Sequence, residues 1–368
     1  MGGAEKVLIN YINYFNTFHR KEFNVELFLI SYEGKLLVEL NENIKISYLY
    51  KGNDTLNKKN PLERFLYKIY RKIISFLFIK FPILYNVFFS KYINYNYNFI
   101  FVQDLYWFSK TNLGKKKYLW IQNNLNKVAD SKRFKNQAFT SNIDKLIAIS
   151  DGIYNDLITR LKIKPELVLK CNNPIDSARI RSLSEEEFVP YFNELYLVSM
   201  GRLVNQKGFD LLLKSLALLK ENKVNVKLVI IGGGEDYNKL LDLAESLNLI
   251  VGVDFVITGL MTNPYPIIKN STIFVCSSRF DGLSTSINEA MCLNIPIVST
   301  PCDYGPKEII CDNLYGIISS DISAKSLMIS IKEMLESDQM LNRYANASMS
   351  RSLHFDIMNV GKILINSL

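Results

Sequence analysis

The sequence is poor in the residues that build metal centres and disulfide frameworks. It has 368 residues but only two histidines, His19 and His354, which lie far apart along the chain. The cysteines form no C-x-x-C pair and are odd in number. They are Cys171, Cys276, Cys292, Cys302 and Cys311. This pattern argues against a zinc site, a histidine-based catalytic triad and a secreted disulfide framework. We therefore expect a protein of the reducing cytoplasm without a metal site.

Long apolar runs are also lacking. The longest, residues 73–89, is interrupted by Lys80 and Pro82 and falls short of the ~20 residues that a membrane-spanning helix needs. The opening MGGAEKV has no apolar core of a signal peptide. Apolar residues nevertheless make up 48% of the chain, enough for a sizeable globular core, and the length predicts two domains.

Charge is divided unevenly between the two halves. Residues 1–180 carry 28 Lys and Arg against 15 Asp and Glu, whereas residues 181–368 carry 16 against 21. A basic first half predicts an anionic partner. An AT-rich genome would also raise the lysine count, but it does not explain why the halves differ in sign.

Apolar runs alternate with amphipathic stretches in the second half. Strands are expected at 195–200, 226–231, 254–257, 272–276, 296–299 and 314–318. Helices are expected at 209–220, 236–247, 284–293 and 324–335. The alternation predicts βαβ units and a doubly wound α/β domain whose parallel sheet is covered on both faces.

The first half shows a noisier form of the same pattern. Strands are expected at 24–30, 45–49, 99–102, 118–121, 145–149 and 167–171, and helices at 5–18, within 61–94 and at 151–161. We divide the chain into domains 1–180 and 181–353, with a linker near 173–193, and expect residues 354–368 to form a helix that crosses back to the first domain. Ligands of such folds bind in the cleft at the carboxyl ends of the strands.

The stretch MGRLVNQKG, residues 200–208, follows one expected strand and precedes a helix. Gly201 allows close approach of the backbone to a ligand. Arg202 offers a fork for phosphate oxygens, and Lys207 offers a point charge beside the helix N-terminus. An ordinary polar turn explains the spacing about as well.

The stretch SRFDGLSTSINE, residues 278–289, also leads from a strand into a helix. Gly282, Leu283 and Ser284 expose backbone N–H groups at the helix start, which is typical of an anion site. Asp281 and Glu289 are suited to accept hydrogen bonds from sugar hydroxyls. Alternatively, Asp281 is a charge at the helix N-terminus and Glu289 a solvated helix residue.

Together these stretches resemble the retaining glycosyltransferases of family 4, whose GT-B fold has two Rossmann-like domains that face an interdomain cleft. The resemblance covers most of the chain. In the second half it is carried by VSMGRLVNQKGFDLLLKSLALL, VKLVIIGGGED, FVITGL and SSRFDGLSTSINEAMCLNIPIVSTPCDYGPKEII, and more weakly in the first half by GGAEKVLIN, AISDGIYNDL and NNPID.

The resemblance implies a nucleotide-sugar donor, above all a UDP-sugar, and gives roles to named residues. Arg202 and Lys207 would neutralise the donor diphosphate, and Glu289 would bind the ribose. Asp281, where the family usually has glutamate, would contact the transferred sugar. The backbone of residues 282–284 would hold phosphate and sugar oxygens.

Further positions follow from the same resemblance. Gly2 and Gly3 would approach the donor phosphates and the acceptor, and the base would rest near Thr258 and Gly259. Gln122 stands where many members have a histidine. The family's mechanism implies attack on the same face through an oxocarbenium-like state, with the leaving phosphate taking the acceptor proton and no metal or other cofactor.

The sequence departs from the family at its start. Members normally have a full strand before the Gly-Gly loop, and here only Met1 precedes it. Such a loss would leave backbone groups of the first sheet unpaired. We interpret this as a misassigned start codon or a truncated gene.

A basic and aromatic segment runs from Lys58 to Lys91. It holds eight Lys and Arg against one acid, Glu63, with aromatic residues at helical spacing between them. This composition favours an interfacial helix on an anionic membrane. Alternatively, the aromatic residues are core and the lysines a solvated face. No recognised module supports nucleic-acid binding.

The combined prediction is a cytoplasmic enzyme, peripheral on the inner face of the cell membrane. It would move a hexose from a nucleotide-sugar to a lipid-linked glycan in the biosynthesis of a bacterial surface polysaccharide, such as O-antigen, capsule or lipopolysaccharide. One alternative is an inactive or truncated GT-B protein with a binding or scaffold role. The other is a nucleotide-sugar 2-epimerase, although two histidines offer little acid–base chemistry.

Overall fold

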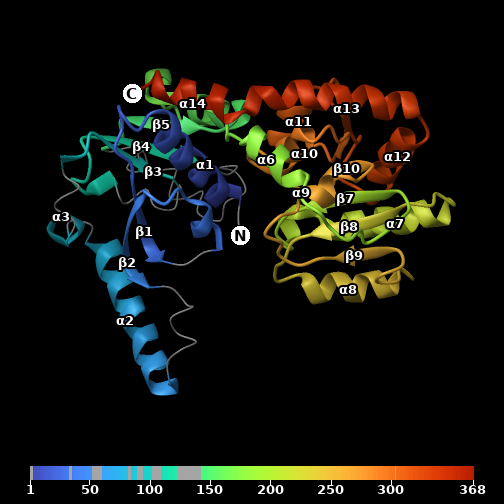
Figure 1. The fold of residues 1–368 in the computed structure, drawn as a ribbon, viewed down its shortest axis with the longest axis horizontal. Coiled ribbons are helices and arrows are strands. Elements are labelled where there is room, and N and C mark those ends of the chain that lie inside the picture. The colour runs from blue at the N-terminus through green and yellow to red at the C-terminus, as the bar shows by residue number, and fades with distance from the viewer. Residues whose placement is uncertain are drawn as a thin grey trace. The chain divides into compact units, whose positions relative to one another are not determined.

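Parallel strands joined by helices make up both halves of the chain, as the apolar runs predicted. A computed structural model describes residues 3–32, 35–51, 60–81, 84–88, 94–101, 109–122, 142–302 and 304–368. The chain forms two compact units (Figure 1). The first unit comprises Gly3–Ala148 and Tyr154–Lys170, and the second comprises Ile149–Ile153 and Cys171–Leu368.

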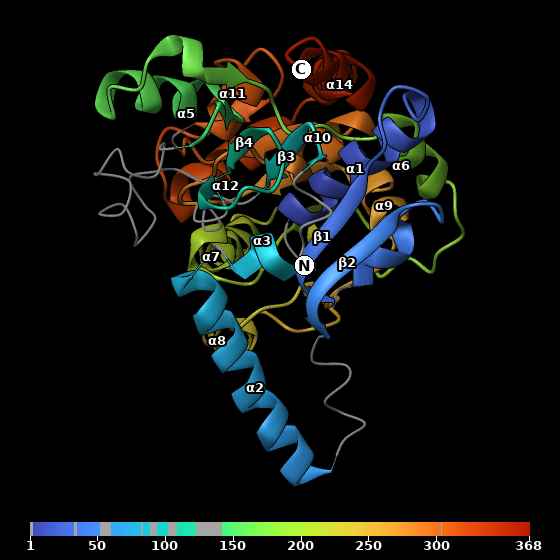
Figure 2. The same cartoon turned by 90° about the vertical axis from the view of Figure 1, so that its left-hand side faces the viewer.

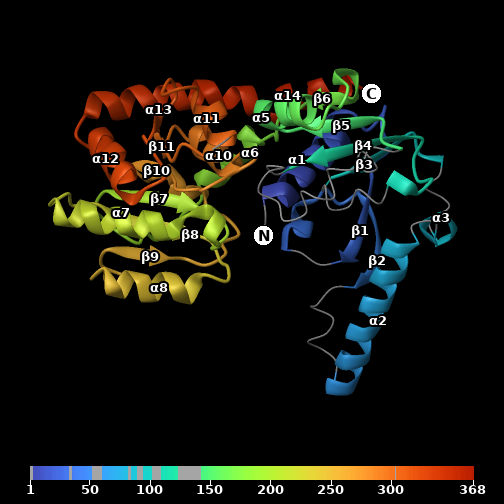
Figure 3. The same ribbon diagram turned by 180° about the vertical axis from the view of Figure 1, so that it is seen from behind.

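The second unit is built on a parallel sheet with the strand order β12-β11-β10-β7-β8-β9 within the described residues (Figure 3). The strands are β7 (Tyr196–Met200), β8 (Lys227–Ile231), β9 (Phe255–Ile257), β10 (Ile273–Cys276), β11 (Ile297–Ser299) and β12 (Ile317–Ile318). Counted along the chain, this is the order 3-2-1-4-5-6 of dinucleotide-binding sheets. The order reverses between β7 and β10, and folds of this kind bind ligands beyond the carboxyl ends of the strands at that point.

Helices cover this sheet on both faces. They are α6 (Ser177–Ser184), α7 (Phe209–Glu221), α8 (Tyr237–Ser246), α9 (Tyr265–Lys269), α10 (Thr285–Cys292), α11 (Gly305–Ile310), α12 (Ala324–Leu335), α13 (Asp338–Ser352) and α14 (Ile357–Ile365). The apolar sides of α7, α8 and α12 form one core with the sheet, and α10 packs with α6, α11 and α13. The four helices predicted for this half are confirmed within two residues at each end.

Helix α6 lies inside the stretch 173–193, where the sequence predicted a linker. Its first turn is capped by Asp176, whose carboxylate accepts a hydrogen bond from the N–H of Arg179 (3.0 Å). Beyond the cap, α6 packs on α9 and α10. The N–H of Ile175 donates to the carbonyl of Phe355 (2.9 Å), which joins this stretch to the chain just before α14. The predicted return of the last helix to the first domain stays a prediction.

Within its described residues, the first unit contains two parallel sheets. One is the pair β1 (Glu26–Tyr32) and β2 (Lys45–Lys51), and the other has the order β3 (Tyr97–Ile100), β4 (Lys116–Ile121), β5 (Lys145–Ala148) and β6 (Val168–Lys170). The other helices in the described ranges are α1 (Gly3–Phe18), α2 (Pro61–Lys80), α3 (Leu84–Phe88), α5 (Asp151–Asn155) and a π-helical turn at Asp156–Arg160. Short 3₁₀ turns occur at Lys35–Glu39, Pro165–Leu167, Asn205–Lys207 and Leu353–Phe355.

Helix α1 packs against both sheets of the first unit. Ile12 belongs to a buried cluster with Leu27 of β1, and the ring of Tyr11 lies 5.9 Å from that of Trp120 in β4. Among the described residues β1 pairs only with β2 and β3 only with β4. Each therefore keeps one edge without a partner strand there, and the interpretation of a misassigned start codon or a truncated gene stays a prediction.

Helix α2 stands out from the β1–β2 pair as a long rod (Figure 2). Asn60 caps it by accepting a hydrogen bond from the N–H of Glu63 (2.8 Å), and Pro61 occupies its first turn, where a missing N–H costs nothing. No described helix is long and apolar enough to cross a membrane.

Candidate functional site

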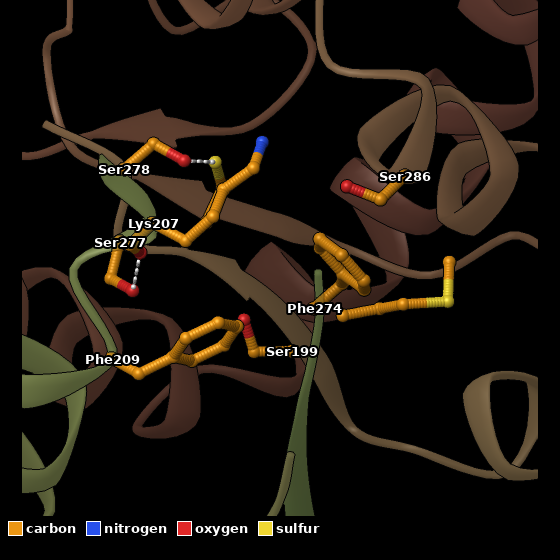
Figure 4. A pocket seen from close by; sticks show the side chains of 9 residues that line it. Ser199, Lys207, Phe209, Phe274, Ser277, Ser278 and Ser286 are labelled. Carbon is orange, nitrogen blue, oxygen red and sulfur yellow. Dashed lines mark hydrogen bonds between the residues drawn. The ribbon is translucent and has the colours of Figure 1, made fainter. Parts of the chain in front are cut away.

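A small open pocket lies at the reversal point of the second sheet (Figure 4). Its empty volume is about 200 Å³. It is lined by the ends of β7 and β10 and by the two loops that follow them. The lining residues are Ser199, Met200, Lys207, Phe209, Phe274, Cys276, Ser277, Ser278 and Ser286. The predicted Lys207 is therefore in the place where this topology predicts a ligand.

Lys207 and Asp281 form an ion pair at this pocket. The ammonium Nζ lies 2.6 Å from Oδ2 of Asp281, and the two side chains are 19% and 12% exposed. Burial alone would lower the pKa of Lys207, but the Asp281 carboxylate, helped by Cys276 and Cys302, raises the pKa above its ordinary value. Lys207 therefore stays cationic at neutral pH, as a phosphate ligand must.

The two predicted stretches touch through their backbones. Gly208 has φ +64°, and a Cβ atom there would lie only 2.0 Å from the carbonyl oxygen of Ser277. Glycine alone permits both the left-handed conformation and this close approach. The aliphatic stem of Lys207 lies over Gly201, where a Cβ would have ordinary contact distances. The loops after β7 and β10 thus form one surface.

The start of α10 presents backbone donors beside Asp281. The N–H of Gly282 donates to Oδ1 of the Asp281 carboxylate (3.0 Å). The N–H groups of Leu283 and Ser284 have no hydrogen-bond acceptor among the described residues. Gly305 passes so close that a Cβ would lie 2.8 Å from the Cα of Leu283. Unpaired N–H groups at a helix N-terminus suit an anionic ligand.

Glu289 lies one turn into α10 and is 4% exposed. The hydroxyl of Tyr265 in α9 donates a hydrogen bond to its Oε1 (3.4 Å). The interpretation of Glu289 as a solvated helix residue is therefore wrong, because α10 turns this side chain toward α9. A buried carboxylate that accepts from a tyrosine hydroxyl is a polar group set inside the unit, close to the start of α10.

Other predicted residues of the second unit surround the same sheet edge. Arg202 is exposed, and its side chain has no ion-pair or hydrogen-bond partner in the described part of the chain. Thr258 follows β9, and its N–H continues the ladder by donating to Ile230 (3.0 Å). Gly259 has φ +75° and bridges to Gly232. Arg202 thus follows the carboxyl end of β7, and Thr258 and Gly259 follow that of β9.

The predicted residues of the first unit are placed separately. Gln122 follows β4 and is 8% exposed, and its amide donates to the carbonyl of Phe101 (3.5 Å). Gly3 is the first residue of α1. Gly2 lies outside the described residues. The structure thus brings together Lys207, Asp281 and the start of α10, all in the second unit.

Sequence reasoning gave no role to Tyr265 or Gly305. Tyr265 lies outside the quoted stretches and reaches Glu289 from α9. Gly305 lies in the same quoted stretch as Leu283 and Glu289, where the Gly-Pro dipeptide at 305–306 was its one local signal. No group of three or more His, Cys, Asp or Glu side chains in the described ranges could hold a metal ion. The expectation of metal-independent chemistry stays a prediction.

Residues 183–351 match the family model "Glycosyl transferases group 1". The chain is also similar to an uncharacterized glycosyltransferase of Methanocaldococcus jannaschii, with 29% identity over 58% of this chain and 59% of the relative. It is 27% identical to the N-acetylgalactosamine-N,N'-diacetylbacillosaminyl-diphospho-undecaprenol 4-alpha-N-acetylgalactosaminyltransferase of Campylobacter jejuni, over 66% of this chain and 64% of that enzyme. The matched part thus spans about 59–64% of the length of these relatives.

Among solved structures the chain resembles Anabaena HepE in complex with UDP and glucose. The TM-score is 0.77 at 16% identity, over 100% of this chain and 95% of HepE. It also resembles Staphylococcus aureus TarM in complex with UDP, with a TM-score of 0.62 at 18% identity over 73% of this chain and 54% of TarM. The fold is GT-B, as predicted, with parallel sheets and alternating helices in both units.

Proposed function

We propose that the chain is a retaining glycosyltransferase of family 4 that moves a hexose from a UDP-sugar to a lipid-linked glycan. The observation that carries the proposal is the ion-paired Lys207 at the reversal point of the second sheet. The match of residues 183–351 to a glycosyltransferase model supports it. The name of the Campylobacter jejuni relative, which refers to a diphospho-undecaprenol-linked sugar, supports the choice of a lipid-linked acceptor.

The donor diphosphate would lie between Lys207 and the start of α10. Lys207 supplies a charge that persists at neutral pH, and the N–H groups of Leu283 and Ser284 supply oriented donors. Arg202 is free to turn toward the same phosphates. Glu289 would accept hydrogen bonds from the ribose. The positive charges of Lys207 and Arg202 would take the place of a divalent ion in neutralising the diphosphate.

The transfer would need no carboxylate nucleophile. As the bond from the sugar to the phosphate lengthens, negative charge grows on the leaving diphosphate, where Lys207 and the α10 N–H groups stabilise it. The leaving phosphate oxygen would take the proton of the attacking hydroxyl. Asp281 is held by Lys207 and Gly282, so its remaining lone pairs would orient hydroxyls of the transferred sugar.

Two measurements test the donor and the reaction. Calorimetry with UDP and GDP on the full chain should show UDP binding with no added metal. Membranes incubated with a panel of radiolabelled nucleotide-sugars should then yield label in the lipid extract. Binding without transfer of any sugar would favour the scaffold alternative. An epimerised nucleotide-sugar without transfer would favour the epimerase.

The membrane contact would be made by α2. One side of this helix carries exposed apolar side chains at every third or fourth position, the spacing of a continuous stripe. We call it the α2 stripe. Its members, with their exposed fractions, are Leu62 (68%), Phe65 (60%), Leu66 (55%), Ile69 (39%), Ile73 (52%) and Phe76 (63%).

The opposite side of α2 packs against strand β2 of the same unit. The hydroxyl of Tyr67 donates to the carbonyl of Lys51 in β2 (2.9 Å), and the guanidinium of Arg71 lies 4.8 Å from the ring centre of Tyr50. One alternative was that the aromatic residues of this segment are core. For Phe65 and Phe76 of the α2 stripe that alternative is wrong, because both are exposed and the contacts with β2 are made by the opposite side of the helix. Of the segment Lys58–Lys91, residues 58–59, 82–83 and 89–91 lie outside the described ranges.

A row of basic residues borders the α2 stripe. Arg64, Lys68 and Lys72 are all exposed and follow each other at intervals of four. An apolar stripe flanked by cations suits the boundary of an anionic bilayer, at ~1 kcal/mol for each basic residue near the surface. This arrangement supports a peripheral location on the cytoplasmic face. Co-sedimentation with vesicles, with and without an anionic lipid, tests it, and no binding at low salt would contradict it.

A further inference from the structure

Arg279 connects the loop after β10 to the beginning of α7. Its guanidinium donates two hydrogen bonds to the carboxylate of Asp210, at 2.8 and 2.7 Å. Nη1 also donates to the carbonyl of Asn205 (2.7 Å). A guanidinium that holds a carboxylate with both arms fixes direction as well as distance. Arg279 therefore braces both the 3₁₀ turn that carries Lys207 and the first turn of the next helix.

The 3₁₀ turn is held at each of its three residues. Nη1 of Arg279 binds the carbonyl of Asn205, the backbone N–H of Arg279 binds that of Gln206 (2.8 Å), and the hydroxyl of Ser277 binds that of Lys207 (2.9 Å). All three donors come from the loop after β10. The position of the Lys207 backbone is thus set by residues about seventy positions away in sequence.

The pair is partly buried and fully charged. Arg279 and Asp210 are 27% and 30% exposed. Burial would raise the pKa of Asp210, but the hydrogen bonds and charge of Arg279 hold it below its ordinary value. Both groups are therefore ionised at neutral pH, and neither is turned toward the pocket, which is lined by Ser277 and Ser278 from this loop.

We propose that Arg279 and Asp210 are positioning residues that hold the Lys207 ammonium where the donor diphosphate binds. This inference rests on the proposed function. A lysine side chain is long and flexible, so its ammonium keeps one position at the phosphates only when the backbone of its turn is fixed. The Arg279–Asp210 pair fixes this turn. Loss of the brace would let Lys207 move with its turn, and the cost would fall on recognition of the second phosphate.

The test compares UDP with UMP, which lacks that phosphate. The full chain, Arg279→Met and Asp210→Asn are titrated with both nucleotides, and the ratio of the two dissociation constants is the readout. We expect each variant to lower the preference for UDP about tenfold, with little change for UMP. In a Lys207→Met background, Arg279→Met should change the preference less than about twofold, because its effect passes through Lys207.

A matched control lies at the other end of α7. Lys220 forms an ion pair with Asp254 (2.8 Å), far along the helix from the site. Lys220→Met should lower the thermal midpoint and leave the UDP preference unchanged. If Arg279→Met does not fold, Arg279→Lys carries the test, since one ammonium cannot reproduce the guanidinium fork.

The outcomes separate this inference from the proposed function. Suppose that the wild-type protein binds UDP through Lys207. If Arg279→Met and Asp210→Asn then keep the wild-type preference for UDP over UMP, the positioning role alone is overturned. Additive effects of Arg279→Met and Lys207→Met would also overturn it. Wild-type protein that binds neither UDP nor GDP would overturn the donor site, and the positioning role with it.

Discussion

The loops after β7 and β10 and the outer side of α2 use charge and apolar surface in opposite ways. At the loops, four charged groups are paired and partly buried, Lys207 with Asp281 and Arg279 with Asp210, whereas Arg202 is exposed. On α2, apolar side chains are exposed and exposed basic residues lie beside them. Under the proposed function, the first arrangement would fix atoms for a small polar ligand. The second would contact a larger apolar partner.

The same difference appears in the two units as a whole. The second unit has one continuous parallel sheet, and its functional groups gather where the strand order reverses. The first unit has two sheets linked by α1, and its most conspicuous feature is a helix on the surface. Four substitutions test this contrast between the two regions.

Removal of the Lys207 charge should abolish donor recognition. Lys207→Met takes away the cation at the diphosphate and leaves Asp281 without its partner, so we expect UDP affinity to fall on the order of 100-fold. Calorimetry measures the affinity. Lys220→Met, which breaks another lysine–aspartate pair of the same unit, should leave it unchanged. Equal losses in both variants would mean that the pair only stabilises the fold.

The close contact of the two loops can be tested with two glycines. Gly208 and Gly252 both have positive φ, but a Cβ at Gly252 meets nothing within 4 Å. Gly252→Ala should cost about 1 kcal/mol from its backbone conformation, and Gly208→Ala about 3 kcal/mol because it also meets Ser277. Hydrogen exchange of α7 measures both. Similar costs would show that the loops can move apart.

Polar substitution of the α2 stripe should weaken membrane binding without unfolding the protein. Phe65→Gln together with Phe76→Gln removes two exposed rings, and we expect vesicle binding to fall at least about tenfold at unchanged thermal midpoint. Ile329, which is 51% exposed on α12, gives a matched control in the second unit. Weaker vesicle binding by Ile329→Gln to the same extent would argue against a specific α2 contact.

The smallest effect concerns acid stability. Burial would raise the pKa of Asp254, but hydrogen bonds from Lys220 and the N–H of Ile250 lower it below its ordinary value. A lowered pKa gives stability that is present above the unfolded value of about 3.8 and is lost as pH falls through the folded value. Asp254→Asn should therefore lower the thermal midpoint at pH 7 and make no difference near pH 2. An equal deficit at both pH values would contradict this.

Element positions were largely predictable, because buried parallel strands are short apolar runs and their covering helices are amphipathic. The predicted strand at 272–276 became β10, and the helix at 324–335 became α12. Prediction failed at α6, whose small and polar residues give no periodic signal. It is set by the Asp176 cap and by packing on α9 and α10.

The sequence alone indicated which side chains suit phosphates or sugar hydroxyls and roughly where strands lie, since both follow from residue type and local pattern. Lys207, Asp281 and the glycines around them were named on that basis. Only the tertiary structure decided that Lys207 pairs with Asp281, that Tyr265 contacts Glu289, and that Arg279 braces the turn before α7. These contacts join residues 24 to 74 positions apart, and no local rule encodes them. The strand order places β7 beside β10 and thereby brings the loops after these two strands into contact.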